Sequence, residues 1–223
     1  MLLHLTKISI MQLPLLPLKS IFFPGETVPL HIFEDRYKQL INDCRAEAMT
    51  FGIPVYINNK LEYGVEVQLV EVVTTYEGGE MDITCVGRQV FKLVSFINEM
   101  EGKKYAGGEV EFLQSDFDAA DALRLKVLKK IEILYGLMGV KLPKIDVSKF
   151  NSYAFAHKMG LSFEQEYRLL QLTNETLRLN YINEHLDATI LVLNEISRTK
   201  DVIEMNGHFR NFDPLDFKDY KTN

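Results

Sequence analysis

The chain has 223 residues, enough for one large domain or two small ones, with a core that removes about 70% of the unfolded surface from solvent. Hydrophobic residues make up 47% and charged residues 25%, average values for soluble globular proteins, which argues against both disorder and a membrane protein. With 25 basic and 31 acidic residues the net charge is −6, so broad attraction to nucleic acid or to anionic lipid is not expected.

The two cysteines, Cys44 and Cys85, form neither a disulfide framework nor a zinc-binding pattern. The first residues, Met1 to Lys7, lack the basic region, the long apolar run and the cleavage site of a secretory signal. No apolar stretch approaches the roughly 20 residues that cross a bilayer. We therefore expect a soluble protein of the reducing cytoplasm.

The first half of the sequence has the character of β-strands interrupted by prolines. Each proline fixes φ and removes a backbone donor, so strands near the start must lie at a sheet edge or contain a bulge. β-Branched and aromatic residues predict strands over 27–32, 51–57 and 65–76. The paired glycines of Glu77-Gly78-Gly79-Glu80 predict a hairpin turn, followed by strands over 82–86, 90–97 and 105–113.

A single helix interrupts this β-rich half. Its apolar stripe recurs at helical spacing from Phe33 through Tyr37, Leu40 and Ile41 to Cys44. The spacing predicts one helix that carries these five residues on its apolar stripe, with Glu34 and Lys38 as an exposed pair.

After Ser115 the apolar period becomes helical. A helix is predicted over 116–137, followed by a linker over 139–148. The sequence Ser162-Phe163-Glu164-Gln165 is a capping box, and a long helix restarts at Asn174 and ends near Gly207. Its apolar seam suits packing along other helices or along a second copy of the chain, at Leu179, Ile182, Leu186, Thr189, Leu193 and Ile196. We expect two parts, 1–114 and 115–223.

The order of several short motifs resembles a known family. They are Leu13-Pro14-Leu15-Leu16-Pro17-Leu18, Pro29-Leu30-His31-Ile32-Phe33-Glu34, Phe51-Gly52 and Val86-Gly87-Arg88. In this order they resemble the amino-terminal, substrate-binding domain of Lon proteases, most closely bacterial proteins that carry that domain alone. The resemblance implies an α+β fold: a mainly antiparallel, twisted, PUA-like β pseudo-barrel with one helix, then a helical bundle ending in a long helix.

The resemblance also implies a non-catalytic protein that binds unfolded or apolar polypeptide and presents it to a separate protease or chaperone. A phosphate-binding Gly-x-x-x-x-Gly-Lys-Ser/Thr loop is missing from the sequence, and Gly102-Lys103-Lys104 does not supply one. The serine and lysine of a Lon peptidase domain have no counterpart either, so we expect no enzyme activity. The five histidines lack metal-ligand spacing, and neither a metal nor a cofactor is expected. A regulator that binds a small molecule or RNA through the same barrel is an alternative that stays open.

Two groups of residues are candidates for binding. The first is the aromatic turn near the start with the adjoining helix, where peptide contact is assigned to Phe22, Phe23, Pro24, Phe33 and Tyr37. The second is a tail that is too aromatic for ordinary disorder, and it is expected to dock on its own domain or on a partner through Phe209, Phe212, Leu215 and Phe217.

Overall fold

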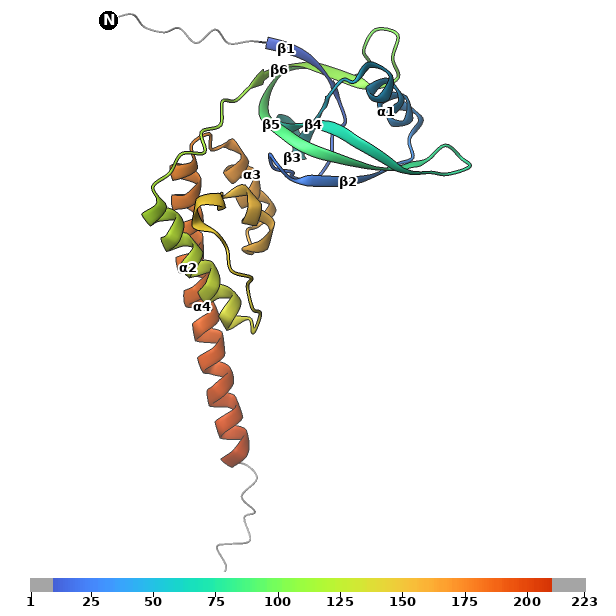
Figure 1. Cartoon of the computed structure of the whole chain (residues 1–223). Helices are drawn as coiled ribbons and strands as arrows, with labels where there is room; N and C mark the ends of the chain where they lie inside the picture. The colour runs from blue at the N-terminus through green and yellow to red at the C-terminus, as the bar shows by residue number, and fades with distance from the viewer. Residues whose placement is uncertain (1–9, 210–223) are drawn as a thin grey trace, which may run out of the picture.

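The computed structural model describes residues 10–209, with side chains as far as Ile203. The β half contains one helix, α1 (Asp35–Glu47), and six strands: β1 (Ile10–Leu15), β2 (Thr27–Ile32), β3 (Phe51–Ile57), β4 (Lys60–Thr75), β5 (Met81–Ile97) and β6 (Ala106–Phe112). The helical half contains α2 (Asp121–Leu137), α3 (Phe163–Gln171), α4 (Glu175–Phe209) and two short 3₁₀ turns, Val147–Lys149 and Tyr153–Lys158. Figure 1 shows the two halves side by side, with α4 running far beyond the rest of the molecule.

The six strands form one sheet that curls into a partly closed barrel. Their order is β2-β5-β4-β3-β1-β6, and a further pairing of β5 with β6 brings the sheet back on itself. All pairs are antiparallel except β1 with β3. The long strand β5 makes closure possible because its first part pairs with β2 and its last part with β6. The predicted α+β class, with a mainly antiparallel twisted pseudo-barrel followed by helices, is confirmed.

Several predicted elements lie where the structure has them, and others need correction. The strands 27–32 and 51–57, the turn at 77–80 and the capping box at Ser162 and Gln165 are confirmed. The two strands expected over 82–97 are one continuous strand, β5. The long helix does not end at Gly207 but continues to Phe209. The division at residues 114 and 115 stays a prediction.

The start of α1 is a second correction. The helix begins at Asp35, and Phe33 lies outside it with 62% of its surface exposed. Strand β2 directs Ile32 into the core, so alternation directs the next residue outward. The extended backbone of Glu34 keeps Phe33 out of the first helical turn. Tyr37, Leu40, Ile41 and Cys44 are buried as predicted.

A fully buried arginine organises the helical half. Arg178 of α4 is 0% exposed, and it donates hydrogen bonds to the Ser152 hydroxyl at 2.9 Å and to the Glu175 carboxylate at 2.8–2.9 Å. It also donates to the backbone carbonyls of Leu172 and Asp116. Its guanidinium lies 4.5 Å from the centre of the Tyr153 ring. The predicted helix start at Asp116 is therefore wrong: this residue forms a backbone bridge with Asn174, and α2 begins at Asp121.

Phe23 and His157 are among the residues that join the two halves, as are Tyr63 of β4 and Tyr167 of α3, whose ring centres lie 6.1 Å apart. Phe23 of the β half is 1% exposed and stacks on Tyr153 with ring centres 5.1 Å apart. His157, also of the helical half, lies 5.0 Å from the Phe23 ring and bonds to Glu166 at 2.8 Å and to Glu26 of the β half at 3.3 Å. The Glu26 and Glu166 carboxylates raise the pKa of His157 to about 9, so the histidine is a cation at neutral pH.

The first prediction concerns the buried arginine. Arg178→Met removes the positive charge and leaves the Glu175 carboxylate buried without a counter-charge, so the free energy of unfolding falls by about 3–5 kcal/mol. Urea titration followed by circular dichroism measures the loss. Arg88→Met, at an exposed position of β5, is the matched control and changes the free energy of unfolding by less than about 0.5 kcal/mol. Adding Glu175→Gln to Arg178→Met recovers part of the loss, and equal losses in Arg178→Met and Arg88→Met contradict the assignment.

The second prediction concerns pH. Because folding raises the pKa of His157 from 6.5 to about 9, its contribution to stability is complete below pH 6.5 and disappears as pH rises through about 9. The side chain is partly exposed, so solvent screening limits this contribution to about 1–2 kcal/mol. His157→Gln therefore lowers the free energy of unfolding at pH 6, and the two proteins converge above about pH 9.5. A stability difference that stays constant from pH 6 to pH 10 contradicts the role of the charge.

Candidate peptide-binding surface

Strand β4 continues past the end of its neighbour β3. The β3–β4 pairing extends only to Phe51 opposite Val67, whereas β5 follows β4 to Thr75 opposite Met81. Residues 68–75 of β4 therefore have a strand on one side only. In the described part of the chain, no backbone hydrogen bond joins 68–75 to any element besides β5. This free edge of β4 presents unpaired backbone donors and acceptors, the template to which an extended peptide can add as a further strand.

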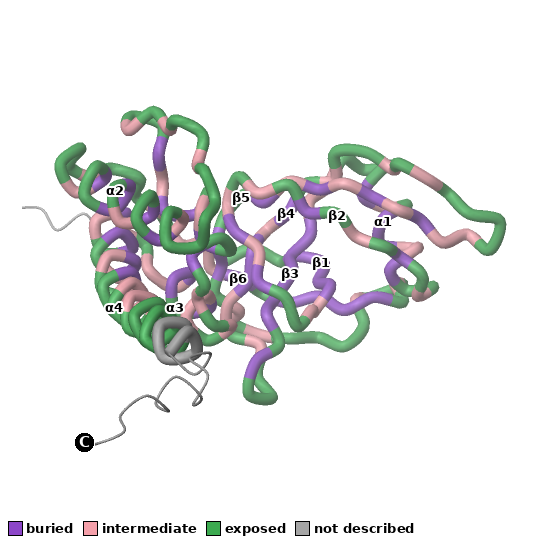
Figure 2. The backbone as a smooth tube through the Cα atoms, turned by 90° about the horizontal axis from the view of Figure 1, so that it is seen from below, coloured by how far each residue is buried: buried purple, intermediate pink, exposed green. Residues whose placement is uncertain are grey.

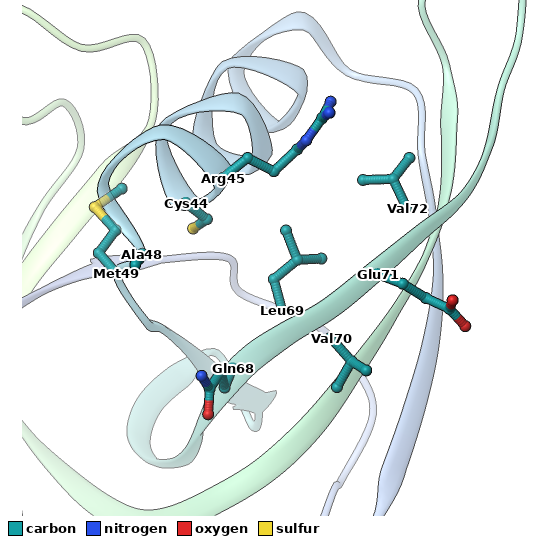
Figure 3. Close-up of a pocket in the computed structure, with 9 residues that line it drawn as sticks. All are labelled: Cys44, Arg45, Ala48, Met49, Gln68, Leu69, Val70, Glu71 and Val72. Atoms are coloured by element: carbon teal, nitrogen blue, oxygen red, sulfur yellow. The ribbon is translucent and has the colours of Figure 1, made fainter.

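The end of α1 faces the free edge and forms a groove with it. The groove encloses a cavity of about 340 Å³, lined from α1 and the turn after it by Cys44, Arg45, Ala48 and Met49, and from β4 by residues 68–72. Ala48 ends α1 in the left-handed conformation, with φ 51°. Figure 3 shows Leu69 directed from β4 toward the helix and Val70 directed away from it.

Two β-bulges shape the same stretch of β4. The register with β5 shifts between Leu69 and Glu71 and again between Val72 and Thr74. The extra residues are Val70 and Val73, which are 61% and 59% exposed. A bulge leaves its extra residue out of the ladder and re-aims its side chain. Two valines are thus presented to solvent beside the free edge, where an apolar partner can cover them.

The side chains that line the groove are suited to binding a partner and not to catalysing a reaction. Burial raises the pKa of the Cys44 thiol to about 12, and the same cause raises the pKa of Cys85 to about 12. Both thiols are therefore protonated at neutral pH and poor nucleophiles. The rim carries one cation, Arg45, and one anion, Glu71, so opposite charges offset each other there.

A second exposed group lies at the same end of the sheet, near the tip of the β4–β5 ribbon. His31 of β2 bonds to Asp82 of β5 at 2.7 Å, and the Tyr76 hydroxyl donates to the other oxygen of that carboxylate at 2.6 Å. These hydrogen bonds, that of Tyr76 foremost, hold the pKa of Asp82 below its usual value. Phe33 stacks beside the His31 ring at 6.1 Å. Phe33 and Tyr76, 62% and 47% exposed, add aromatic surface there, and Tyr76 directly follows β4, three residues after Val73.

The structure separates the five residues proposed for peptide contact. Phe33 is exposed beside His31, as described above. Tyr37 is 8% exposed and lies beneath the Arg36 guanidinium, 4.5 Å from it, and Phe23 is sealed between the two halves. Phe22 is half-buried. Pro24 is also half-buried and lines a separate cavity of about 270 Å³ between the halves. Phe33 is thus the member of the set that lies on the open surface, at the end of β2, which β5 separates from β4.

The residues proposed in the tail fall at or beyond the limit of the structure. Phe209 is the last residue of α4, and Phe212, Leu215 and Phe217 lie outside the described residues. Within residues 10–209, no cluster of three or more metal-ligating side chains is arranged to hold an ion. No described helix combines the length and the apolar character that crossing a membrane requires.

The sequence prediction missed the β4 edge, although a signal for it was present. The alternation of apolar and polar residues is regular from Val65 to Leu69 but then breaks at two apolar doublets, Leu69-Val70 and Val72-Val73. An interruption of the two-residue period in a strand is the signature of a bulge. The end of β3 opposite Val67 leaves no comparable trace in the sequence.

Comparisons with known proteins agree with this fold. The model of the ATP-dependent protease La (LON) substrate-binding domain matches residues 12–188. Among solved structures, the Lon N-terminal domain protein from Xanthomonas campestris aligns with 24% sequence identity and a TM-score of 0.59, over 76% of this chain and 95% of that one. The N-terminal domain of the Mycobacterium avium complex Lon protease aligns with 18% identity and a TM-score of 0.58, over 79% and 98%. No curated protein matches the chain.

A family model that spans residues 12–188 covers most of the chain. The protein therefore belongs to the family of the Lon substrate-binding domain, and the resemblance first seen in its proline-rich opening is confirmed. That domain is a non-catalytic module for recognition of protein substrates.

Proposed function

We propose that this protein recognises exposed apolar segments of polypeptide by adding them as a short strand to the free edge of β4. The observation that carries the proposal is the unpaired stretch 68–75, which borders the groove at the end of α1 in a chain of the Lon substrate-binding family. Backbone pairing supplies affinity that does not depend on client sequence, and the exposed side chains of Val70 and Val73 select apolar side chains.

The dimensions of the surface support weak and broad recognition. A cavity of about 340 Å³ is at the small end of ligand sites and accommodates a few side chains. The two bulges leave Glu71 and Val72 as the only residues of the stretch between register shifts, so an added strand stays short. Because a short ladder yields few hydrogen bonds, side-chain burial against Val70 and Val73 must supply much of the affinity. Such a site holds a client briefly and releases it.

Release of an intact client fits presentation in trans. The sequence contains no Walker A loop, and the thiols nearest the groove are protonated. We therefore propose that clients pass from the β4 edge to a separate protease or chaperone. Phe33 and Tyr76, which enlarge the apolar surface at the end of the ribbon, provide contacts for client residues beyond the groove.

The third prediction tests the position of the site. Val70→Lys together with Val73→Lys places two cations on the free edge and weakens binding of a labelled extended peptide rich in Val, Leu and Phe by at least about ten-fold. Fluorescence anisotropy measures the dissociation constant. Val94→Lys is the matched control because Val94 is also an exposed bulge residue, 51% exposed, but lies in β5 opposite β6. Equal weakening by both variants, or by neither, contradicts the site.

The fourth prediction tests backbone pairing itself. A peptide with the same side chains, but with alternate backbone nitrogens methylated so that one edge cannot donate, binds about ten-fold more weakly than the unmodified peptide. A peptide with serine at every apolar position also loses binding, which separates the contribution of the side chains. Unchanged affinity of the methylated peptide rules out strand addition and leaves side-chain contact alone. A single-stranded RNA probe at low salt, where phosphate contacts are strongest, gives no signal.

A further inference from the structure

The free edge of β4 is open at one end and closed at the other. At the open end, Figure 2 shows the tip of the β4–β5 ribbon projecting from the molecule, with exposed residues in green. At the closed end, Phe51 of β3 pairs with Val67 of β4, and the residues just before Phe51 lead back to α1 without regular secondary structure. A client strand laid along 68–75 follows the same line as β3. It therefore meets the protein's own chain before Phe51, where it must end or turn away.

The segment that closes this end is held by contacts on both sides. Met49 packs against the core and lines the groove. The Thr50 hydroxyl donates a hydrogen bond of 2.6 Å to the Glu66 carboxylate of β4. Because these contacts fix the segment, a client cannot displace it without breaking them. The edge therefore suits the end of a polypeptide better than an internal segment of one.

The direction of the strands indicates which end of a client reaches the closed end. β4 is antiparallel to both of its neighbours, β3 and β5. Antiparallel pairing is also slightly more stable per residue than parallel pairing. A client added antiparallel to β4 runs from the tip of the ribbon toward Phe51, in the direction of β3. Its carboxyl end, and not its amino end, then lies at the closed end beside α1.

The cation of the groove is available to a carboxylate at that position. Arg45 lies in the last turn of α1, lines the groove and is exposed. Within the described residues its side chain has neither a hydrogen bond nor an ion pair. Figure 3 shows Arg45 extending on the same side of β4 as Leu69 and Val72, whereas Glu71 is directed away from the helix. A guanidinium presents a fork of donors that matches the two oxygens of a carboxylate.

From the closed end, the strand direction and the unpaired cation, we propose that the β4 edge binds the free carboxyl-terminal end of an apolar polypeptide. The client lies antiparallel to β4, and its terminal carboxylate pairs with Arg45. This role rests on the proposed function, because it specifies which part of a client the edge binds. Chain ends of folded domains usually lie at the surface. A polypeptide that stops inside an apolar strand carries both required features, so prematurely ended or cleaved chains form the client class.

Competition between peptides for the full chain tests the proposal. Unlabelled peptides of one apolar sequence displace a labelled peptide, measured by fluorescence anisotropy. They end in a free carboxylate, in a carboxamide, or in a carboxylate after four added Gly and Ser residues. The carboxamide and the extended peptide bind about five-fold more weakly than the first peptide. Arg45→Gln binds the carboxylate and carboxamide peptides equally. Arg36→Gln, the same charge change at the start of α1, is the matched control and keeps the preference.

Two further measurements identify the charge as the cause. Higher ionic strength narrows the difference between the carboxylate and carboxamide peptides, because salt screens an exposed ion pair. The urea midpoint of Arg45→Gln equals that of the unmodified protein, because an exposed side chain contributes little to stability.

The possible outcomes separate the carboxyl-end site from the proposed function. If all three peptides bind equally and Val70→Lys with Val73→Lys still weakens binding, strand addition stands and the carboxyl-end site is wrong. A preference for the carboxylate that persists in Arg45→Gln overturns the assignment of Arg45. Weaker binding after acetylation of the peptide's amino end, with no effect of the carboxamide, overturns the antiparallel direction. If no peptide binds, both proposals fail.

Discussion

The unequal length of neighbouring strands is the constraint on which the rest of the structure depends. β4 and β5 have 16 and 17 residues, whereas β2, β3 and β6 have six or seven. A short strand can cover only part of a long one. β5 is nevertheless paired along most of its length, because β2 covers one end and β6 covers the other. The pairing with β6 also closes the barrel. β4 receives β3 on its first part alone, and its last eight residues form the free edge beside α1.

A free edge that binds clients also risks pairing with other copies of itself. The bulges at Val70 and Val73 limit that risk because they interrupt the regular ladder that two identical edges would need. The other outer strand, β2, carries Pro29, which cannot donate to a neighbouring strand. The same bulges turn apolar side chains outward, so they both restrict self-association and provide the contact surface.

Local patterns predicted the elements well because the physical reasons for them are local. Proline, glycine and alternation determine where strands and turns lie, and the motif order identified the family. Phe33 was misplaced because its spacing to Tyr37 is helical, while its actual environment is decided by the alternation of β2 before it. Arg178 was not singled out, because an arginine three residues after Glu175 also resembles an exposed helix pair. Its burial depends on Ser152 and Asp116, which are distant in sequence.

The free edge of β4 was beyond sequence prediction for a similar reason. It follows from where β3 ends relative to β4, a property of the pair that neither strand encodes alone. Phe23 illustrates the opposite case: an aromatic residue in a turn resembles a binding residue, yet Tyr153 and His157, more than a hundred residues later, cover it. Aromatic residues in turns therefore report on function only when the partners supplied by the rest of the chain are known.

Contacts between the two halves hold the proposed binding site in a defined place. Phe23 and His157 join the halves, so the β4 edge has a defined position relative to α4. The tip of the β4–β5 ribbon points away from the helices, and the distal part of α4 extends away from the barrel (Figure 1). The groove beside the β4 edge is lined by the β half alone, so the described helices of the second half leave it open to a client.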